Sequence, residues 1–210
     1  MAQKDTVDRI LNAAEALFAE RGFAETSLRT ITSTANVNLA AVNYHFGSKK
    51  ALIQAVFVRF LEPLSDTLSD QLDTVEEEGK EMLLDDLLDL LVAAVTSAHG
   101  NDVNRTASFM RLLSLAYTQS QGHLRDYLRE RYGRVSNRYI SMLRPACPQL
   151  SDKALFWNTH FALGAAVFSL SNYDALQAMH NDDTGEESPI REVIKRLLGF
   201  ISAGVPVTLE

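Results

Sequence analysis

Apolar side chains recur at intervals of three and four residues along almost the whole chain, and this spacing constrains the fold more than any other feature. The first such stripe lies on one face of a predicted helix and consists of Val7, Ile10, Leu11, Ala14, Leu17 and Phe18. We find no segment with the strict alternation of apolar and polar residues that a half-buried strand shows. Proline and glycine, which interrupt helices, number only five and ten among 210 residues. The sequence therefore predicts an all-α protein.

Capping and turn residues predict where the helices begin and end. Gly22 ends the first helix, Ser48 caps a long one, and Pro63 predicts a kink or break in that long helix. The acidic stretch at residues 73–80 is interpreted as a solvated connection or a frayed helix end. Further stripes predict helices over residues 82–95, 109–115, 124–143, 151–178 and 189–201, with a loop at 180–187 and a Ser188-Pro189 cap.

Composition excludes several classes of protein. With 46% hydrophobic and 22% charged residues the chain is an ordinary globular protein, and its apolar runs are too short to span a membrane. Cys147 is the only cysteine, so an intramolecular disulfide and a Cys-rich zinc site are excluded. The five histidines are scattered, and no phosphate loop or nucleophile elbow is present. We expect a cytoplasmic protein that is not an enzyme and needs no metal or cofactor.

Charge is distributed unevenly along the chain. The net charge is −7, yet residues 26–61 contain no Asp or Glu and carry Arg29, Lys49, Lys50 and Arg59. Residues 61–210 hold 22 acidic and 13 basic side chains. A cationic segment joined to an acidic body suits a protein whose one end approaches phosphates. An absence of acidic residues from this segment by chance is an equal alternative.

Two short helices are predicted inside the acid-free segment. Ser27 or Thr26 can cap the first, and Asn38 can cap the second, which runs from Leu39 to about Tyr44 or His45. Asn36 lies in the turn between them, where asparagine tolerates a positive φ. Two short helices joined by such a turn form a helix-turn-helix.

The residues of this segment closely resemble the DNA-binding domain of TetR-family regulators. The resemblance is carried by TSLRTITSTANVN from Thr26 and VNYHFGSKKAL from Val42, preceded by LFAERGF, and covers about residues 6–55. Three positions depart from the pattern of the family: Asn36 stands where glycine is usual, Thr32 where alanine is usual, and Ala40 where glycine is usual. The resemblance implies a three-helix DNA-binding domain over residues 1–55 and a helical effector-binding and dimerisation domain over 56–210. It also implies a homodimeric repressor of a pseudo-palindromic operator in double-stranded DNA.

Beyond the DNA-binding domain, the sequence resembles the fatty-acid-responsive PsrA-type repressors of the same family. The similar stretches are FMRLL from Phe109, QSQGHLR from Gln119 and FALGAA from Phe161. They imply control of fatty-acid metabolism genes and release by a long-chain fatty acid or acyl thioester. One alternative is a TetR-type repressor of an efflux or stress operon that responds to aromatic, drug-like ligands. Another is a helical adaptor that binds only proteins.

Short polar side chains at the start of a recognition helix reach base edges, and flanking hydroxyls and cations reach phosphates. Asn43 is a candidate for contact with a base. Asn38 is equally a candidate for contact with a base or for a role as helix cap alone. Lys49 is a candidate for contact with a phosphate, and a solvated side chain is the alternative. The predicted DNA-contacting residues are Thr26, Ser27, Arg29, Asn38, Leu39, Ala40, Ala41, Asn43, Tyr44, His45 and Lys49.

Residues 161–168 are apolar or small all round, so a helix there needs cover on more than one side. A second subunit is the favoured cover, and burial within one chain is the alternative. The predicted dimer interface comprises Ala162, Gly164, Ala165, Ala166, Ser169, Ile190, Val193, Ile194 and Leu197. Candidates for a small apolar effector, with plain core packing as the alternative, are Phe109, Met110, Arg111, Leu113, Tyr117, Tyr127, Trp157, His160, Phe161 and Phe168.

Overall fold

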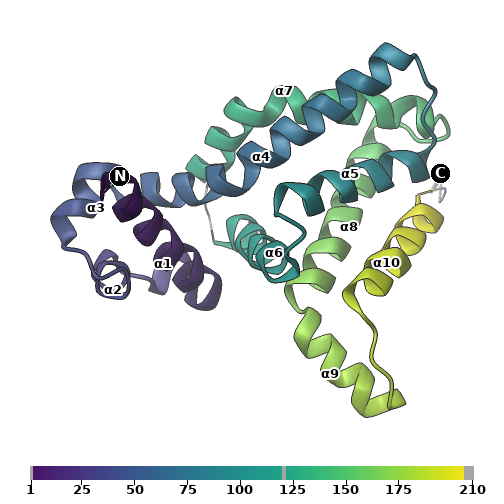
Figure 1. Ribbon diagram of the computed structural model, residues 1–210. Coiled ribbons are helices and arrows are strands. Elements are labelled where there is room, and N and C mark those ends of the chain that lie inside the picture. The colour runs from purple at the N-terminus through teal and green to yellow at the C-terminus, as the bar shows by residue number, and fades with distance from the viewer. Residues whose placement is uncertain (1, 120–121, 206–210) are drawn as a thin grey trace.

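The computed structural model describes residues 2–119 and 122–205, with side chains from Lys4 onward (Figure 1). Within these residues every regular element is a helix, which confirms the all-α prediction. In chain order the helices are α1 (Ala2–Glu25), α2 (Leu28–Thr34), α3 (Leu39–Phe46), α4 (Lys49–Glu78), α5 (Leu84–Ala98), α6 (Val103–Thr118), α7 (Gly122–Ala146), α8 (Asp152–Ser171), α9 (Tyr173–Thr184) and α10 (Ile190–Gly204).

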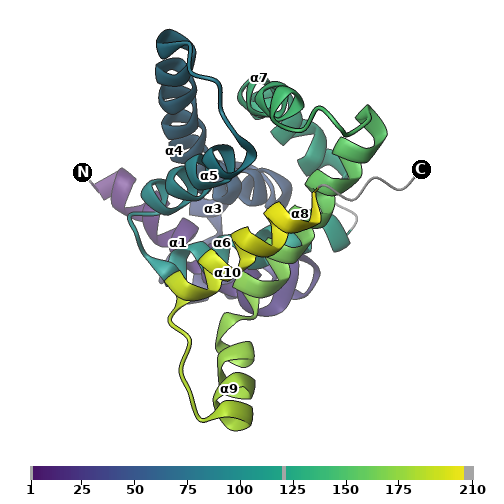
Figure 2. The same cartoon turned by 90° about the vertical axis from the view of Figure 1, so that its right-hand side faces the viewer.

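The helices form a small head and a larger body. Helices α1, α2 and α3 gather at one end of the molecule, and α4 leads from them into the body, where it packs against α5 and α7 (Figure 1). Helices α8 and α10 pack side by side at the opposite end, and α9 projects away from them (Figures 1 and 2). The head is therefore well separated from α9 and α10.

Two apolar cores hold this arrangement together. The first joins the stripe of α1 to α2, α3, α4 and α6, and Phe18, Phe57 and Leu112 are fully buried in it. The second lies between α4, α5, α7, α8 and α10, and in it Tyr139 Oη donates to the Leu87 carbonyl oxygen at 2.9 Å. Each fully buried large side chain contributes about 1.5–3 kcal/mol. Because the first core crosses from head to body, the two parts are packed as one unit.

The N-terminal helix ends as its sequence predicts, with one addition. Gly22 has φ 83° and ψ 169°, so the regular helix stops there, and one further turn follows to Glu25. Phe23 folds back onto the apolar stripe of α1, with its ring 5.4 Å from that of Phe18.

Helix α4 narrows two predictions: it continues through Pro63, which excludes a break there, and it extends to Glu78, so residues 73–78 are the end of a helix and not a connection. Proline removes one backbone donor and costs about 3 kcal/mol, but Leu68 and Leu72 beyond it are buried in the second core. Arg138 of α7 then donates to Asp73 at 2.6 Å and to Glu76 at 2.9 Å, which ties the last turns to the body. Gly79, with φ 60°, ends the helix.

The C-terminal helices also differ from prediction. The helix expected over residues 151–178 is capped by Ser151 as predicted but stops at Asn172, whose side chain donates to the Phe168 carbonyl oxygen at 2.9 Å. Helix α9 then covers residues 173–184, so the predicted loop begins only at Gly185, with φ 72°. Pro189 is the N-cap of α10 rather than its first helical residue.

None of the helices within the described ranges combines the length and the apolar character needed to cross a membrane.

Candidate nucleic-acid interface and small-molecule pocket

Side-chain caps build the two short helices of the head. Ser27 Oγ accepts from Thr30 N at 3.0 Å, Asn38 Oδ1 accepts from Ala41 N at 2.8 Å, and Ser48 Oγ accepts from Ala51 N at 3.1 Å. Asn36 has φ 51°, the left-handed conformation expected of it. The predicted helix-turn-helix is confirmed together with its caps.

The turn between α2 and α3 is fastened by a residue that sequence reasoning missed. Arg9 of α1 donates to the carbonyl oxygen of Ala35 at 2.6 Å and also to that of Asn36. These bonds satisfy carbonyl groups at the end of α2, where the helix itself offers no donors. Twenty-six residues separate the partners, so no local pattern could reveal the contact.

Helix α3 buries one face and exposes the other. Val42 is fully buried and Phe46 packs against the same core, whereas Asn43 is exposed and Tyr44 is 77% exposed. Ala41 and His45 lie at the half-buried edges. The outward face of α3 and its cap comprise five predicted DNA-contacting residues, Asn38, Leu39, Ala40, Asn43 and Tyr44. A major groove admits such a helix with its outer side chains toward the bases.

Thr26 does not belong to this outward surface, contrary to the prediction. Its side chain is fully buried, and its hydroxyl donates to the carbonyl oxygens of Gly22 at 2.8 Å and Leu17 at 3.1 Å. The hydroxyl therefore joins the end of α1 to the start of α2. Threonine at the start of a helix gives the same sequence signal whether its hydroxyl points outward or inward.

The cationic side chains of the acid-free segment differ in whether they are accessible to phosphates. Arg29 is exposed beside the Ser27 cap, and Lys49 Nζ donates to the Ala24 carbonyl oxygen at 3.3 Å from the edge of the head. Arg59 faces inward, where it hydrogen-bonds to Asn12 and lies 3.7 Å from Glu15. Burial raises the pKa of Glu15, and Arg59 and Arg105 oppose that rise. Arg59 thus neutralises an acid of α1 and is not available to phosphates.

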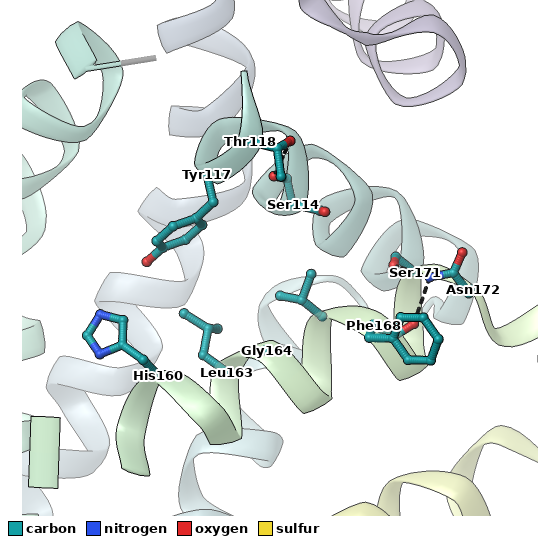
Figure 3. A pocket seen from close by; sticks show the side chains of 10 residues that line it. Ser114, Tyr117, Thr118, His160, Leu163, Gly164, Phe168, Ser171 and Asn172 are labelled. Carbon is teal, nitrogen blue, oxygen red and sulfur yellow. Dashed lines mark hydrogen bonds between the residues drawn. The ribbon is translucent and has the colours of Figure 1, made fainter. Parts of the chain in front are cut away.

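A cavity of about 310 Å³ lies between α6 and α8 (Figure 3). Three of the predicted effector residues, Tyr117, His160 and Phe168, line it. The rest of its wall is formed by Ser114, Thr118, Leu163, Gly164, Val167, Ser171 and Asn172. The sequence prediction missed these seven as effector residues because small and aliphatic residues on a helix look the same in a pocket wall and in a core.

The other predicted effector residues lie elsewhere. Phe109 and Met110 are buried in the first core, where Phe109 stacks on Phe60 at 5.3 Å, and Leu113 packs against that core. Arg111 donates to the Ser171 carbonyl oxygen at 2.9 Å and pairs with Asp174. Tyr127 is half-buried on α7, away from the cavity wall.

Large aromatic side chains are exposed on α8 and α10. Trp157, Phe161 and Phe168 follow one another at helical spacing on α8, with 50%, 66% and 61% of their surface exposed. Phe200 on α10 is 69% exposed. We call the three residues on α8 the aromatic face. By contrast, the predicted interface residues Ile190, Ile194, Ala162 and Leu197 pack partly into the two cores.

Two family models match the chain. The model of bacterial regulatory proteins of the tetR family matches residues 10–56, and the tetracyclin repressor-like C-terminal domain matches residues 89–204. The chain belongs to the TetR family. The N-terminal match covers the head with its helix-turn-helix, and the C-terminal match covers the cavity and the aromatic face.

Relatives and solved structures agree with membership of the TetR family. The probable HTH-type transcriptional regulator YttP of Bacillus subtilis is 34% identical over 87 residues, or 41% of this chain and 42% of YttP. The match thus spans less than half of that curated relative. PfmR, a TetR family transcriptional regulator from Thermus thermophilus, superposes with a TM-score of 0.58 at 18% identity, over 93% of this chain and 98% of PfmR. FadR from Bacillus subtilis, solved with stearoyl-CoA, superposes with a TM-score of 0.54 at 15% identity, over 93% of this chain and 97% of FadR.

YttP, PfmR and FadR are each named as a transcriptional regulator, and the family of this chain is one of regulators and not of enzymes, in agreement with the prediction. The fold class is likewise confirmed, with an N-terminal helix-turn-helix and a helical C-terminal part.

Proposed function

We propose that this TetR-family protein is a homodimeric repressor that binds a pseudo-palindromic operator and is released by a small, largely apolar effector. Residues 1–55 act as the reading head and residues 56–210 as the effector-binding and dimerisation body. The observation that carries the proposal is the outward face of α3, where Asn43 and Tyr44 are exposed while Val42 anchors the helix to the core. The acid-free segment around it lowers the electrostatic cost of approaching phosphates.

Selection of bound duplexes from random DNA tests the reading head. We expect an inverted repeat whose half-sites lie about one helical turn apart, or a multiple of it, because a two-fold dimer presents two heads to one side of a duplex. Recovery of unrelated sequences without dyad symmetry would contradict the proposal.

The aromatic face supports dimerisation. Clusters of exposed aromatic side chains are uncommon on monomers and are typical of interfaces. We expect Phe161→Ser to shift the protein toward monomer in analytical ultracentrifugation. Met179→Ser is the matched control, because Met179 is 62% exposed on α9, outside the aromatic face. Equal dimer affinity for both variants would exclude this face.

A long-chain fatty acid or its thioester is the effector that we propose. The cavity wall is mostly apolar, and the hydroxyl groups of Ser114 and Tyr117 offer a few polar contacts. The fold shared with FadR, whose structure holds stearoyl-CoA, supports the same ligand class. Controlled genes would then serve fatty-acid metabolism.

A second effector class is favoured by the size and wall of the cavity. At about 310 Å³ the cavity lies near the lower end of the range for ligand pockets, and Tyr117, His160 and Phe168 supply aromatic rings. Release by aromatic, drug-like compounds, with control of an efflux or stress operon, is the corresponding function. A release assay with fatty acids, acyl thioesters and aromatic drugs, performed on the selected operator, separates the two classes.

A further inference from the structure

The peptide group between Gly22 and Phe23 is hydrogen-bonded at both of its ends. The Gly22 carbonyl oxygen accepts from Thr26 Oγ1 at 2.8 Å, and the Phe23 N–H donates to Gln119 Oε1 at 3.0 Å. Thr26 directly precedes Ser27, the cap of α2, whereas Gln119 is the C-cap of α6. One peptide group therefore links the end of α6 in the body to the start of the helix-turn-helix.

The close approach of Gln119 depends on the glycine. Gly22 has φ 83° and ψ 169°, a combination that side chains rarely tolerate. A Cβ atom added at Gly22 would lie 2.6 Å from Gln119 Nε2, which is closer than real Cβ contacts. Phe23 itself is 1% exposed, and its ring packs between those of Phe18 and Phe57. The peptide cannot move away from Gln119 unless the end of α1 moves with it.

Gln119 also follows directly on the cavity wall. Tyr117 and Thr118 line the cavity from the last turn of α6, and Ser114 lines it from the turn before (Figure 3). The Thr118 hydroxyl donates to the Ser114 carbonyl oxygen at 3.0 Å, so this part of the helix is held as one piece. A ligand that displaces the last turn of α6 must displace the carboxamide of Gln119 as well.

We propose that Gln119 transmits occupancy of the cavity to the reading head through the Gly22–Phe23 peptide. Displacement of the carboxamide would leave the buried Phe23 N–H unpaired, a costly state, unless the end of α1 follows. When α1 follows, Thr26 and α2 shift relative to α4, and the spacing of the two α3 helices in a dimer changes. Gln119 is thus a positioning residue that contacts neither DNA nor effector. The inference rests on the proposed function.

Three variants test this role. Gln119→Met keeps the length of the side chain but cannot accept the bond, and Gln119→Glu keeps an acceptor oxygen. Gln177→Met is the matched control, because Gln177 Oε1 likewise accepts a backbone N–H, that of Ser188 at 3.1 Å, but on α9 far from the head. Operator affinity is measured with and without oleate or oleoyl-CoA, and the ratio gives the coupling.

We expect the ligand-induced weakening of operator binding to fall about three- to tenfold in Gln119→Met, the size of one hydrogen bond's contribution. Gln119→Glu and Gln177→Met should keep the wild-type ratio. Binding of oleate or oleoyl-CoA to Gln119→Met is measured calorimetrically. Unchanged binding would show that the variant keeps the effector site and has lost only the transmission of ligand binding to the reading head. A wild-type ratio in Gln119→Met would overturn the inference.

A measurement from the DNA side needs no effector. Because coupling between two sites is reciprocal, operator binding should change hydrogen exchange in residues 112–119 of the wild type and not in Gln119→Met. If oleate and oleoyl-CoA fail to release the wild type from the operator, only the proposed effector is wrong. The hydrogen-exchange measurement then still tests the role of Gln119. An equal exchange response in both proteins would refute the role of Gln119 alone. Failure to select any duplex would refute the proposed function and the inference with it.

Discussion

The inward hydroxyl of Thr26 leads to a prediction that separates a structural role from a DNA contact. Thr26→Val keeps the shape of the side chain but leaves the Gly22 carbonyl oxygen, and the second acceptor at Leu17, without this donor. The side chain is fully buried, so water cannot replace the bond. Losing one partner of a buried hydrogen bond costs about 1–3 kcal/mol. Thr26→Ser keeps the hydroxyl and loses one buried methyl group, for a smaller loss of about 1 kcal/mol.

The assay is urea denaturation at a fixed protomer concentration, since unfolding of a dimer depends on concentration. A chain of this length should lose about 2–4 °C of melting temperature per kcal/mol. The salt dependence of operator binding, measured on folded protein, should keep its slope in Thr26→Val. An unfolding midpoint equal to that of the wild type, combined with a shallower salt slope, would show that Thr26 contacts phosphate and that its inward placement is wrong.

Three further predictions concern named side chains. Lys49→Ala should weaken binding to all duplexes and reduce the slope of affinity against salt concentration by about one phosphate contact. Lys153→Ala, at the far end of the molecule on α8, is the control and should change neither quantity. A loss of affinity confined to one operator position would contradict a phosphate contact by Lys49. Asn43→Ala should relax discrimination at particular base pairs by about 1–3 kcal/mol, measured on a panel of single-base operator variants, and an unaltered ranking of that panel would remove Asn43 from base contact. Burial between Phe60 and Phe109 lowers the pKa of His99 from 6.5 to about 4, and the Arg105 charge acts in the same direction. Between these two pH values the unfolded chain binds a proton at His99 that the folded chain does not, so stability is lost as the pH falls through this range. The urea midpoint of the wild type should therefore fall more steeply from pH 6.5 to 4 than that of His99→Gln, and parallel profiles would count against a buried neutral imidazole.

How much of the head could be read from the sequence depends on the range of each interaction. The caps at Ser27, Asn38 and Ser48 each bond a backbone N–H three residues ahead, so the residue and its partner lie within one short window. The left-handed turn at Asn36 is local as well. The sequence predicts each of these features, and each is present.

The candidate sites of the body are less accessible to sequence reasoning. Trp157 and Phe161 are aromatic residues at helical spacing, which favours the effector site, but they are exposed and their rings stack on one another at 5.9 Å. Phe109 fits the same description and is buried in the core. Apolar character and spacing identify a face of a helix but not what covers it.

The sequence by itself determined the helical class, the helix-turn-helix and its family, because these follow from periodicity and from contacts within four residues. Only the tertiary structure decided that Arg9 fastens the turn, that Thr26 points inward, that α4 runs to Glu78 without a break at Pro63, and that Gln119 reaches the head. Each of these last features is set by how the helices pack. The bond from Gln119 to Phe23 spans 96 residues, and its partners meet only because two separate helices bury their apolar faces in one core.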